Sequence, residues 1–449
     1  MSNLDHRYAT RSVPRYTSYP TAPHFHAGVT GATYGDWLAG LPADTPLSLY
    51  LHVPYCRVIC SYCGCHTKAA RRDEPLLDYT DALLAEIDLV AERLPQRSRT
   101  VHIHWGGGTP SLLPRAQFLS VVERLHRHFV FDPAHEHAIE LDPRTVTEEL
   151  AETLREAGIT RASLGVQDFD PVVQKAIGRV QPFEQVASAV ERLRAVGIDA
   201  LNFDLMYGLP FQTLETVTET IRLTRDLAPG RIALFGYAHV PWMKKHQRLI
   251  DESRLPDSRE RIAMADHARA HLIEAGYRAI GLDHFAMPDD TMAQALDAGR
   301  LRRNFQGYTT DTADTLIGFG ASSIGRLPQG YIQNMPDTGG WSRAIADGLL
   351  PVARGIALDA DDRARADIIE RLMTEHAADI GEIAAAHGLP LAHFSGSMAD
   401  LGELVEDGLV EIDGARIRVT PRGAPYARIA AAAFDIYLQS GLARHSVAV

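Results

Sequence analysis

Cysteine is scarce in this chain of 449 residues: it has only 4, and all lie between Cys56 and Cys65. The chain therefore lacks both scattered buried thiols and the disulfide framework of a small secreted domain. It also lacks any run of 18 apolar residues, so no membrane span is expected. Its first residues, MSNLDHRYATRS, have no apolar core, so we expect no secretory signal and a cytoplasmic protein with reduced thiols.

An excess of positive charge is also lacking. The chain has 45 Lys and Arg against 57 Asp and Glu, which gives a formal net charge of -12. Such a chain has no general affinity for nucleic acid or for an anionic membrane, and we expect neither as a partner. An anionic substrate would need a local cluster of cationic side chains.

What the sequence does contain is an alternation of predicted strands and helices. Short apolar segments that end in polar residues or Gly are separated by segments with helical period. The predicted strands are 48–55, 100–105, 137–143, 161–167, 200–208 and 231–239, with 279–285 as a candidate seventh. Repeated β-α units imply an α/β fold with a parallel sheet, either closed as a barrel or open.

Glycines mark the ends of three predicted helices. The segments REAGIT, RAVGID and IEAGYR each lead from a helix into a strand, and they contain Gly158, Gly197 and Gly276. Each glycine suits the left-handed position just past a helix end.

A chain of this length predicts more than one domain, because single cores stop growing near about 250–300 residues. Residues 1–35 include RYTSYPTAP and are predicted to form an extended N-terminal arm. We assign residues 36–355 to the barrel and residues 356–449 to a mostly helical C-terminal domain. This last part has a hairpin predicted at Asp413-Gly414, which resembles a winged helix without a basic stripe for DNA.

Unusual polar residues follow five consecutive predicted strands. They are Gly106 to Thr109, Glu140 with Asp142, Gln167 with Asp168, Asp204, and His239. The carboxyl ends of parallel barrel strands form one face, where active sites lie. Ordinary turn and capping roles explain any one of these residues, but the series indicates a shared site.

The cysteines follow the first of these strands with the spacing C-x3-C-x2-C, in Cys56, Cys60 and Cys63. Three thiolates on one loop can hold three irons of a [4Fe–4S] cube and leave the fourth iron open. A zinc site that uses the cysteines with His66 is an alternative, although structural zinc usually draws ligand pairs from separate segments. Two disulfides among thiols this close would be strained, and cytosol would reduce them.

A glycine-rich loop, HWGGGTP, follows the second strand and would lie beside the cluster. CxxxCxxC after a first strand, with such a loop after the second, resembles the radical S-adenosylmethionine (SAM) superfamily. Within it, the chain is similar to the oxygen-independent coproporphyrinogen III oxidases, also called dehydrogenases. The motifs behind this are YTSYPTA (16–22), LYLHVPYCRVICSYCGC (49–65), HWGGGTP (104–110), IELDPR (139–144), LGVQDF (164–169), DLMYGLP (204–210), YAHVP (237–241), DHFA (283–286) and RNFQGYTT (303–310).

The resemblance implies a partial (β/α)6 TIM-like barrel and a specific reaction. In this family SAM binds the open iron, and its cleavage gives methionine and a 5′-deoxyadenosyl radical. The radical takes a hydrogen from a propionate side chain, which then loses CO2 and one electron to become a vinyl group. Two propionates of coproporphyrinogen III react in this way, giving protoporphyrinogen IX. A reduced flavodoxin or ferredoxin as electron donor and a monomeric state are further expectations.

The resemblance also assigns residues by motif. Metal ligands are Cys56, Cys60 and Cys63. Residues expected beside the cluster-bound SAM are Tyr50, Gly107, Gly108, Thr109, Glu140 and Ile324. The family can bind a second SAM, and the matching positions are Tyr62, Gln167, Arg179, Asp204 and Ala238. No catalytic residue is certain, because the SAM radical performs the chemistry; Tyr50 and Cys65 are the candidates.

Cys65 and the cations that would bind the substrate are not assigned by the motifs. The role of Cys65 is open between packing and the handling of electrons or protons. A substrate with four carboxylates needs local cations, for which the candidates are Arg15, Lys244, Lys245, Arg302 and Arg303.

Related functions on the same scaffold compete with this interpretation. A haem-delivery protein with a dormant cluster is one, but Cys65 and YTSYPTA argue against it. Another radical SAM enzyme acting on tetrapyrroles is the second, but RNFQGYTT and the arm favour the oxidase.

The cysteine hypothesis predicts different outcomes for two alanine variants. Cys60→Ala is expected to abolish the absorption between about 300 and about 450 nm that an iron–sulfur cluster gives after anaerobic reconstitution. Cys65→Ala is expected to retain it, because an open-iron cube needs only three thiolates. A fully absorbing Cys60→Ala protein would refute the ligand assignment.

Overall fold

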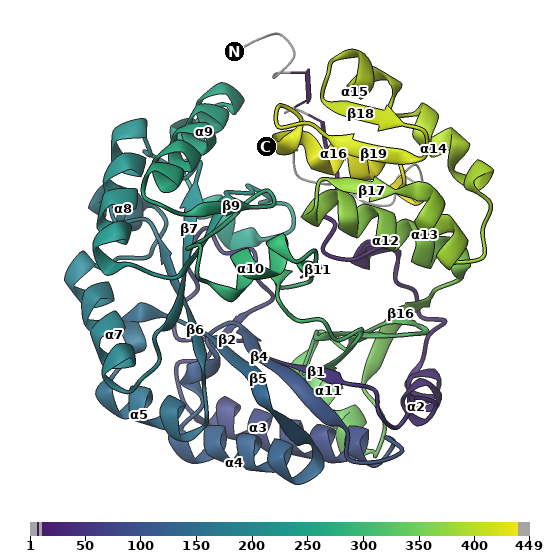
Figure 1. Ribbon diagram of the computed structural model, residues 1–449. Helices are drawn as coiled ribbons and strands as arrows, with labels where there is room; N and C mark the ends of the chain where they lie inside the picture. Colours follow the sequence, from purple (N-terminus) through teal and green to yellow (C-terminus); the bar gives the residue numbers. More distant parts are fainter. Residues whose placement is uncertain (1–6, 9–10, 439–449) are drawn as a thin grey trace.

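The computed structural model describes residues 7–8 and 11–438, and a 12-stranded sheet lies at its centre (Figure 1). The parallel strands are β1 (Leu47–Val53), β4 (Arg99–Gly107), β5 (Val130–Leu141), β6 (Arg161–Gln167), β7 (Ala200–Tyr207), β8 (Arg231–Gly236) and β13 (Thr315–Phe319). The strand order is β16-β15-β14-β13-β1-β4-β5-β6-β7-β8-β10-β9. This linear order makes the sheet an open, partial barrel.

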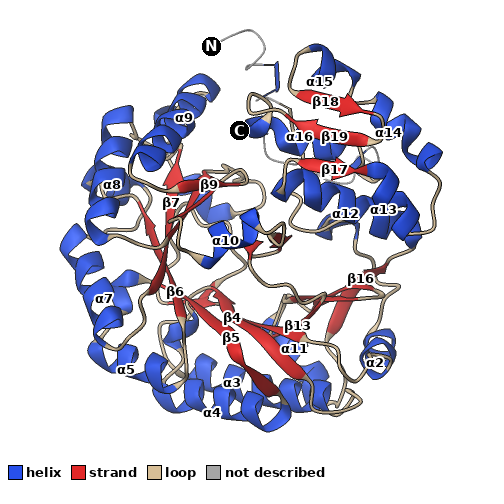
Figure 2. Cartoon of the chain, viewed as in Figure 1, coloured by secondary structure: helices blue, strands red, loops and turns tan. Residues whose placement is uncertain are grey.

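Six β-α units build most of this sheet, as the sequence predicts. Their helices cover its outer side in an arc (Figure 2). These helices are α3 (Glu74–Ala91), α4 (Arg115–His128), α5 (Glu148–Glu156), α7 (Phe183–Ala195), α8 (Leu214–Leu227) and α9 (Ser258–Glu274). Gly158, Gly197 and Gly276 have φ of 75°, 85° and 95°, which confirms the predicted left-handed helix ends.

Strand alternation decides what faces the barrel interior. In β1, Leu47, Leu49 and Leu51 are fully buried in the apolar core shared with the helices. Tyr50 lies on the opposite face, where its ring stacks on His104 of β4 with centroids 6.0 Å apart. The interior of this barrel is therefore polar, unlike the layers of branched apolar residues that fill most closed barrels.

The segment 279–285 is not one strand, so the prediction of a seventh unit there is wrong. It forms two short antiparallel strands, β9 (Arg278–Ile280) and β10 (His284–Ala286), joined by a turn at residues 281–283. A Gly-Leu-Asp turn interrupts the strand pattern. The sequence pattern also missed the opposite edge of the sheet, which consists of β13, β14 (Ile324–Leu327), β15 (Gly330–Asn334) and β16 (Val352–Ala357).

Smaller elements complete this part of the chain. They are α2 (Gly31–Ala39), β2 (Tyr55–Cys56), β3 (Lys68–Ala69), α6 (Pro171–Ala176), α10 (Thr291–Asp297), β11 (Arg302–Asn304), β12 (Gly307–Thr309) and α11 (Thr338–Ala346).

A second apolar core belongs to the C-terminal part of the chain, at the upper right of Figure 1. Its elements are α12 (Ala360–Thr374), β17 (Ala377–Asp379), α13 (Ile380–Ala386), α14 (Ser395–Ala399), α15 (Gly402–Glu406), β18 (Val410–Asp413), β19 (Arg416–Val419) and α16 (Ala427–Ala432). Strands β18 and β19 form the predicted hairpin, with Gly414 in its turn. The division at residues 35 and 355 stays a prediction.

The N-terminal arm packs into this second core. Tyr8, Val13, Tyr16 and Tyr19 are buried there. The hydroxyl of Tyr16 donates a hydrogen bond to Asp435 at 3.0 Å. The arm thus stabilises the C-terminal domain, a role the sequence did not indicate.

In the part of the chain that the structure describes, no helix is long and apolar enough to cross a membrane.

Replacing Tyr16 with alanine tests the role of the arm. Loss of a buried ring from a packed core predicts a decrease of about 3 kcal/mol in the free energy of unfolding. Urea denaturation measures this decrease, and Leu349→Ala is the control because Leu349 is 60% exposed. Equal stability of the Tyr16→Ala and Leu349→Ala proteins would show that the arm does not support the core.

Candidate functional site

The cysteine loop follows β1 and runs between the short paired strands β2 and β3 at the carboxyl end of the sheet. Cys56 ends β2, and Cys60 is buried while Cys65 is exposed. All four cysteines are free thiols. The structure therefore places no disulfide in this loop.

Distant segments hold this loop in place. The backbone N–H of Ser61 donates to the carbonyl of Ile177 at 3.0 Å. His246 Nε2 lies 2.6 Å from the carbonyl oxygen of Cys63, and Lys244 Nζ donates to the carbonyl of Cys65 at 2.8 Å. The loop conformation is thus set by the β6–α7 and β8–α9 connections as well as by its own sequence.

Each predicted ligand sulfur accepts a hydrogen bond from the protein. The Thr109 hydroxyl donates to Cys56 Sγ at 3.5 Å, and the Cys65 N–H donates to Cys63 Sγ at 3.4 Å. Cys60 Sγ lies 3.5 Å from Arg179 Nη1 and 3.8 Å from Arg144 Nη2. Donors and cations around sulfur stabilise anionic thiolates and tune an iron–sulfur cluster, so these residues fit such a group.

The pKa values of Cys56 and Cys63 differ because the two thiols have different local contacts. Burial raises the pKa of Cys56 to about 11, whereas hydrogen bonding from Cys65 lowers the pKa of Cys63 to about 6. Among the described residues, no three Cys, His, Asp or Glu side chains converge tightly enough to hold a single metal ion. A [4Fe–4S] cube does not require its ligands to converge on one ion, because each thiolate ligates a different iron.

Tyr50 and Glu140 meet at the glycine-rich loop. A Cβ at Gly106 would lie 2.9 Å from both the Tyr50 hydroxyl and Glu140 Oε1, so a larger residue there would displace one of these side chains. Glu140 also accepts hydrogen bonds from the Gly107 N–H at 3.2 Å and from His104 Nε2 at 3.4 Å. The structure therefore brings together Tyr50, Gly107 and Glu140 of the predicted SAM residues.

The loop after the second strand pairs with the start of the cysteine loop. Gly108 N–H donates to the Val53 carbonyl at 2.9 Å, and Thr109 N–H donates to the Tyr55 carbonyl at 2.8 Å. Ile324 joins this region less directly: its carbonyl lies against Gly318, which is the β13 partner of Tyr50.

Arg179 is buried beneath the cysteine loop and has several partners. It donates to the Gly165 carbonyl at 2.6 Å and lies 3.5 Å from a carboxylate oxygen of Asp142. Gln167 and Arg179 both lie close to Gly165, where a Cβ would be 3.0 Å from Gln167 Nε2. Arg179 therefore contacts the cysteine loop at Cys60 and also pairs with Asp142.

Asp204 lies inside the barrel beside other polar groups. It accepts hydrogen bonds from Asn202 at 2.9 Å and from Ser163 at 3.1 Å. Burial, with repulsion from Glu140, raises the pKa of Asp204 to about 6. Asp168, by contrast, is fully buried and is bonded by Gln212 and Thr220, so it is a structural residue of the α8 side.

One amide connects the two remaining predicted residues. Gln247 Nε2 donates to the Tyr62 carbonyl at 2.8 Å and to the Ala238 carbonyl at 3.2 Å. Sequence reasoning missed Gln247, and also Arg144 and His246. Arg144 ends the IELDPR motif and is therefore detectable in the sequence, whereas His246 and Gln247 lie in the 3-10 helix Lys245–Leu249, which no local pattern predicts.

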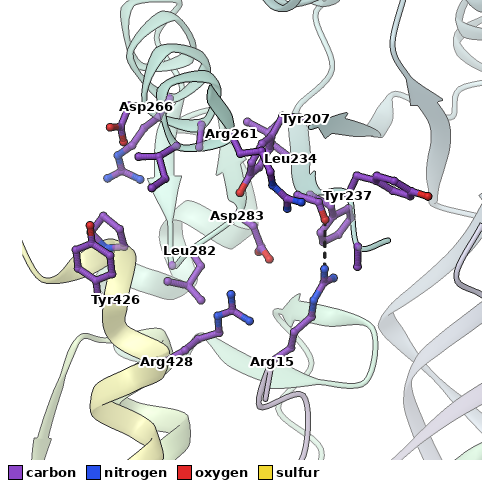
Figure 3. A pocket seen from close by; sticks show the side chains of 18 of the residues that line it. Arg15, Tyr207, Leu234, Tyr237, Arg261, Asp266, Leu282, Asp283, Tyr426 and Arg428 are labelled. Carbon is purple, nitrogen blue, oxygen red and sulfur yellow. Dashed lines mark hydrogen bonds between the residues drawn. The ribbon is translucent and has the colours of Figure 1, made fainter. Parts of the chain in front are cut away.

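A cavity of about 960 Å³ opens beside Ala238, between the barrel and the C-terminal domain (Figure 3). Of the five predicted substrate cations, Arg15 and Arg303 line it. Arg302 instead pairs with Glu370 and Asp314, and Lys244 contacts the cysteine loop. Neither Arg302 nor the two lysines are among the cavity-lining residues.

Comparison with known proteins gives consistent results. The family model of the radical SAM superfamily matches residues 50–224, and that of the HemN C-terminal domain matches residues 358–426. An oxygen-independent coproporphyrinogen III oxidase of Bradyrhizobium diazoefficiens is 50% identical over 442 residues, covering 98% of each chain. One from Paracoccus denitrificans is 44% identical, covering 97% of this chain and 96% of the relative.

A solved structure is also similar over nearly the whole chain. It is that of coproporphyrinogen III oxidase (HemN) from Escherichia coli, described as a radical SAM enzyme. The TM-score is 0.91 at 35% identity, covering 95% of this chain and 100% of the other.

The raised pKa of Asp204 predicts a pH-dependent stability difference from Asp204→Asn. The folded protein binds this proton more tightly than the unfolded chain does. The free energy of unfolding of the wild type, relative to the variant, is therefore highest near pH 4 and falls until about pH 6. The total fall is about 3 kcal/mol, measured by urea denaturation across this range. Parallel pH profiles of the two proteins would contradict the burial of this carboxyl.

Proposed function

Because the chain belongs to the radical SAM family of oxygen-independent coproporphyrinogen III oxidases, we propose that it converts coproporphyrinogen III to protoporphyrinogen IX. The observation that carries this proposal is the loop of Cys56, Cys60 and Cys63, whose sulfurs each accept hydrogen bonds at the carboxyl end of the sheet. These three thiols would hold a [4Fe–4S] cluster. When bound, the cluster supplies the electron that splits SAM into methionine and a 5′-deoxyadenosyl radical.

The glycine-rich loop would bind the amino acid part of SAM. The N–H groups of Gly107, Gly108 and Thr109 all donate within the protein. What this loop offers a ligand is therefore carbonyl oxygen, which suits an ammonium group. Glu140 adds a carboxylate on the same side, and Tyr50 closes the space next to it.

A second SAM is proposed near Tyr62, Gln167, Asp204 and Ala238. Converting two propionates consumes two SAM molecules, so a second bound molecule would serve the second turn. Asp204 could accept a hydrogen bond from a ribose hydroxyl. Arg179 is less suited to a direct role, because its donors are used by Gly165, Asp142 and Cys60; its proposed function is to position the cluster loop.

The chain's residues would protect a reactive intermediate. Each turn would remove one hydrogen atom from a propionate, after which the propionate loses CO2, passes one electron to a one-electron acceptor and becomes a vinyl group. A radical that attacks C–H bonds must be kept from water. The helices on the outer side of the sheet (Figure 1), together with the loops after β1 and β4 at its carboxyl end, would contribute to that enclosure.

Three further features belong to the proposal. A small reduced flavodoxin or ferredoxin is the proposed electron donor, since the cluster needs single electrons. A monomer in the cytoplasm is the proposed state, and the four free thiols suit a reducing compartment. The arm, the barrel and the C-terminal domain are proposed as the three parts of this monomer.

Mass analysis of the product tests the reaction. Anaerobically reconstituted protein, given coproporphyrinogen III, SAM and a reductant, is expected to yield a product that has lost two CO2 and four hydrogens. Unchanged substrate in the presence of SAM cleavage would overturn the proposed function.

A matched variant tests the SAM site within the same assay. Gly106→Ala places a methyl group between Tyr50 and Glu140 and displaces these side chains, so SAM binding and product formation are expected to decrease while the cluster spectrum remains. Gly158→Ala is the control for a glycine with open space around it, and it is expected to keep full activity apart from a modest stability cost.

A further inference from the structure

The cavity beside Ala238 concentrates positive charge in an acidic protein. Its lining contains seven arginines and two aspartates, although the whole chain carries a net charge of -12. The arginines are Arg15, Arg259, Arg261, Arg269, Arg303, Arg422 and Arg428. We call this the arginine pocket. A surface of average composition would not gather them, so the pocket is built for an anion.

Separate parts of the chain supply these arginines. Arg15 comes from the N-terminal arm, Arg261 from α9 and Arg428 from α16 of the C-terminal domain. Figure 3 shows these three side chains approaching the middle of the pocket from different walls, near Asp283. The pocket is therefore complete only when the arm and the C-terminal domain are packed against the barrel.

Several of these charges lack counter-ions. Among the described residues, Arg15, Arg261 and Arg303 have no carboxylate within 4.0 Å. Arg303 is 8% exposed, and its Nη1 atom has no hydrogen-bond partner, although its other nitrogens hold the Arg15 and Tyr16 carbonyls. Buried polar atoms are rarely left unsatisfied, so this donor indicates a missing acceptor.

Burial and neighbouring charges shift the pKa values of two groups in the pocket, Arg428 and Asp283. Burial and the charge of Arg15 lower the pKa of Arg428 to about 10. Asp283 is one of the two acids in the lining. Burial alone would raise its pKa, but His284, Arg303 and Arg15 hold its pKa well below the usual range. The two aspartates of the lining do not balance its seven arginines, and a ligand with several carboxylates would.

The rest of the pocket wall is aromatic and apolar. Tyr207, Phe235, Tyr237, Trp242 and Phe285 contribute to it. A volume of about 960 Å³ is at the upper end of ordinary ligand pockets. These walls suit a large flat macrocycle whose edge carries the charge.

The pocket also adjoins the cysteine loop. Ala238 lines the pocket, and Gln247 bonds its carbonyl together with that of Tyr62, between Cys60 and Cys63. The Gln247 side chain therefore links the pocket wall at Ala238 to Tyr62 of the cysteine loop, which the proposed function assigns to the cluster.

We propose that the arginine pocket binds the carboxylates of the tetrapyrrole substrate, with Arg261 and Arg428 holding propionates from opposite walls. This assignment rests on the proposed function. Two of the four propionates persist in the product, so arginines that bind them would anchor the macrocycle through both turns. Arg303 positions Arg15 by bonding its backbone and offers Nη1 to the same ligand.

Binding of coproporphyrin III, the stable oxidised form, tests this assignment by fluorescence titration. Arg261→Gln and Arg428→Gln are each expected to raise Kd about tenfold to a hundredfold, as loss of a hydrogen bond to a charged group does. Arg261→Lys and Arg428→Lys are expected to recover part of the affinity. Arg222→Gln on α8, which removes an arginine paired with Glu219 and Asp226, is the matched control with unchanged Kd.

The tetramethyl ester of coproporphyrin III separates charge from shape. The ester is expected to bind the wild type weakly and to lose nothing further in Arg261→Gln. Thermal melting of the apo proteins checks folding: because Arg261 has no ion pair in the described chain, Arg261→Gln is expected to melt at the wild-type temperature.

Two outcomes distinguish the assignment from the function on which it rests. If the wild type forms protoporphyrinogen IX but both glutamine variants bind coproporphyrin III as tightly as Arg222→Gln does, the pocket assignment is wrong and the function stands. If the wild type neither binds coproporphyrin III nor converts coproporphyrinogen III, the function itself fails and the assignment fails with it.

Discussion

The rest of the site depends on how the Cys56–Cys65 loop is held at the carboxyl end of the barrel. A ten-residue loop with three predicted metal ligands has many conformations, and ordering it costs entropy. Contacts from three connections offset that cost: Thr109 after β4, Arg144 after β5, and Arg179 after β6 all reach a cysteine sulfur. The sulfurs are thus positioned by residues that lie far from them in the sequence.

Charge is distributed to the same end. The chain is acidic overall, yet seven of its arginines line the arginine pocket between the barrel, the arm and the C-terminal domain. The arm places one of these arginines in the pocket. Its tyrosines pack into the C-terminal core and Arg303 bonds its backbone, which brings Arg15 to Gly236. Packing of the second domain and recognition of an anion therefore share one interface.

The barrel fold and the cysteine site could be predicted because both leave local signals. Apolar strands that end in polar residues, glycines after helices, and C-x3-C-x2-C are all visible in short windows. The structure confirms the six β-α units and the hairpin at Gly414. The apolar content of residues 279–285 predicts one strand, but the structure has two short strands there, divided by a turn at the centre.

Residues that act through distant contacts could not be predicted. Arg261 and Arg428 are 167 positions apart by their numbers, and no local pattern marks either as part of a pocket. Gln247, in the 3-10 helix Lys245–Leu249, joins Tyr62 to Ala238 through its side chain. Arg302 was a candidate substrate cation, but Glu370, from a helix the motif does not include, already pairs with it. Such pairings appear only when the chain is folded.

The central claim is that three cysteines leave one iron of a cube open for SAM. Mössbauer spectroscopy of anaerobically reconstituted protein, recorded with and without SAM, tests it most directly, because it reports each iron environment. The account predicts that SAM shifts the signal of one iron and leaves the other three unchanged. Irons that are all insensitive to SAM, in a protein that carries a full cluster, would contradict it.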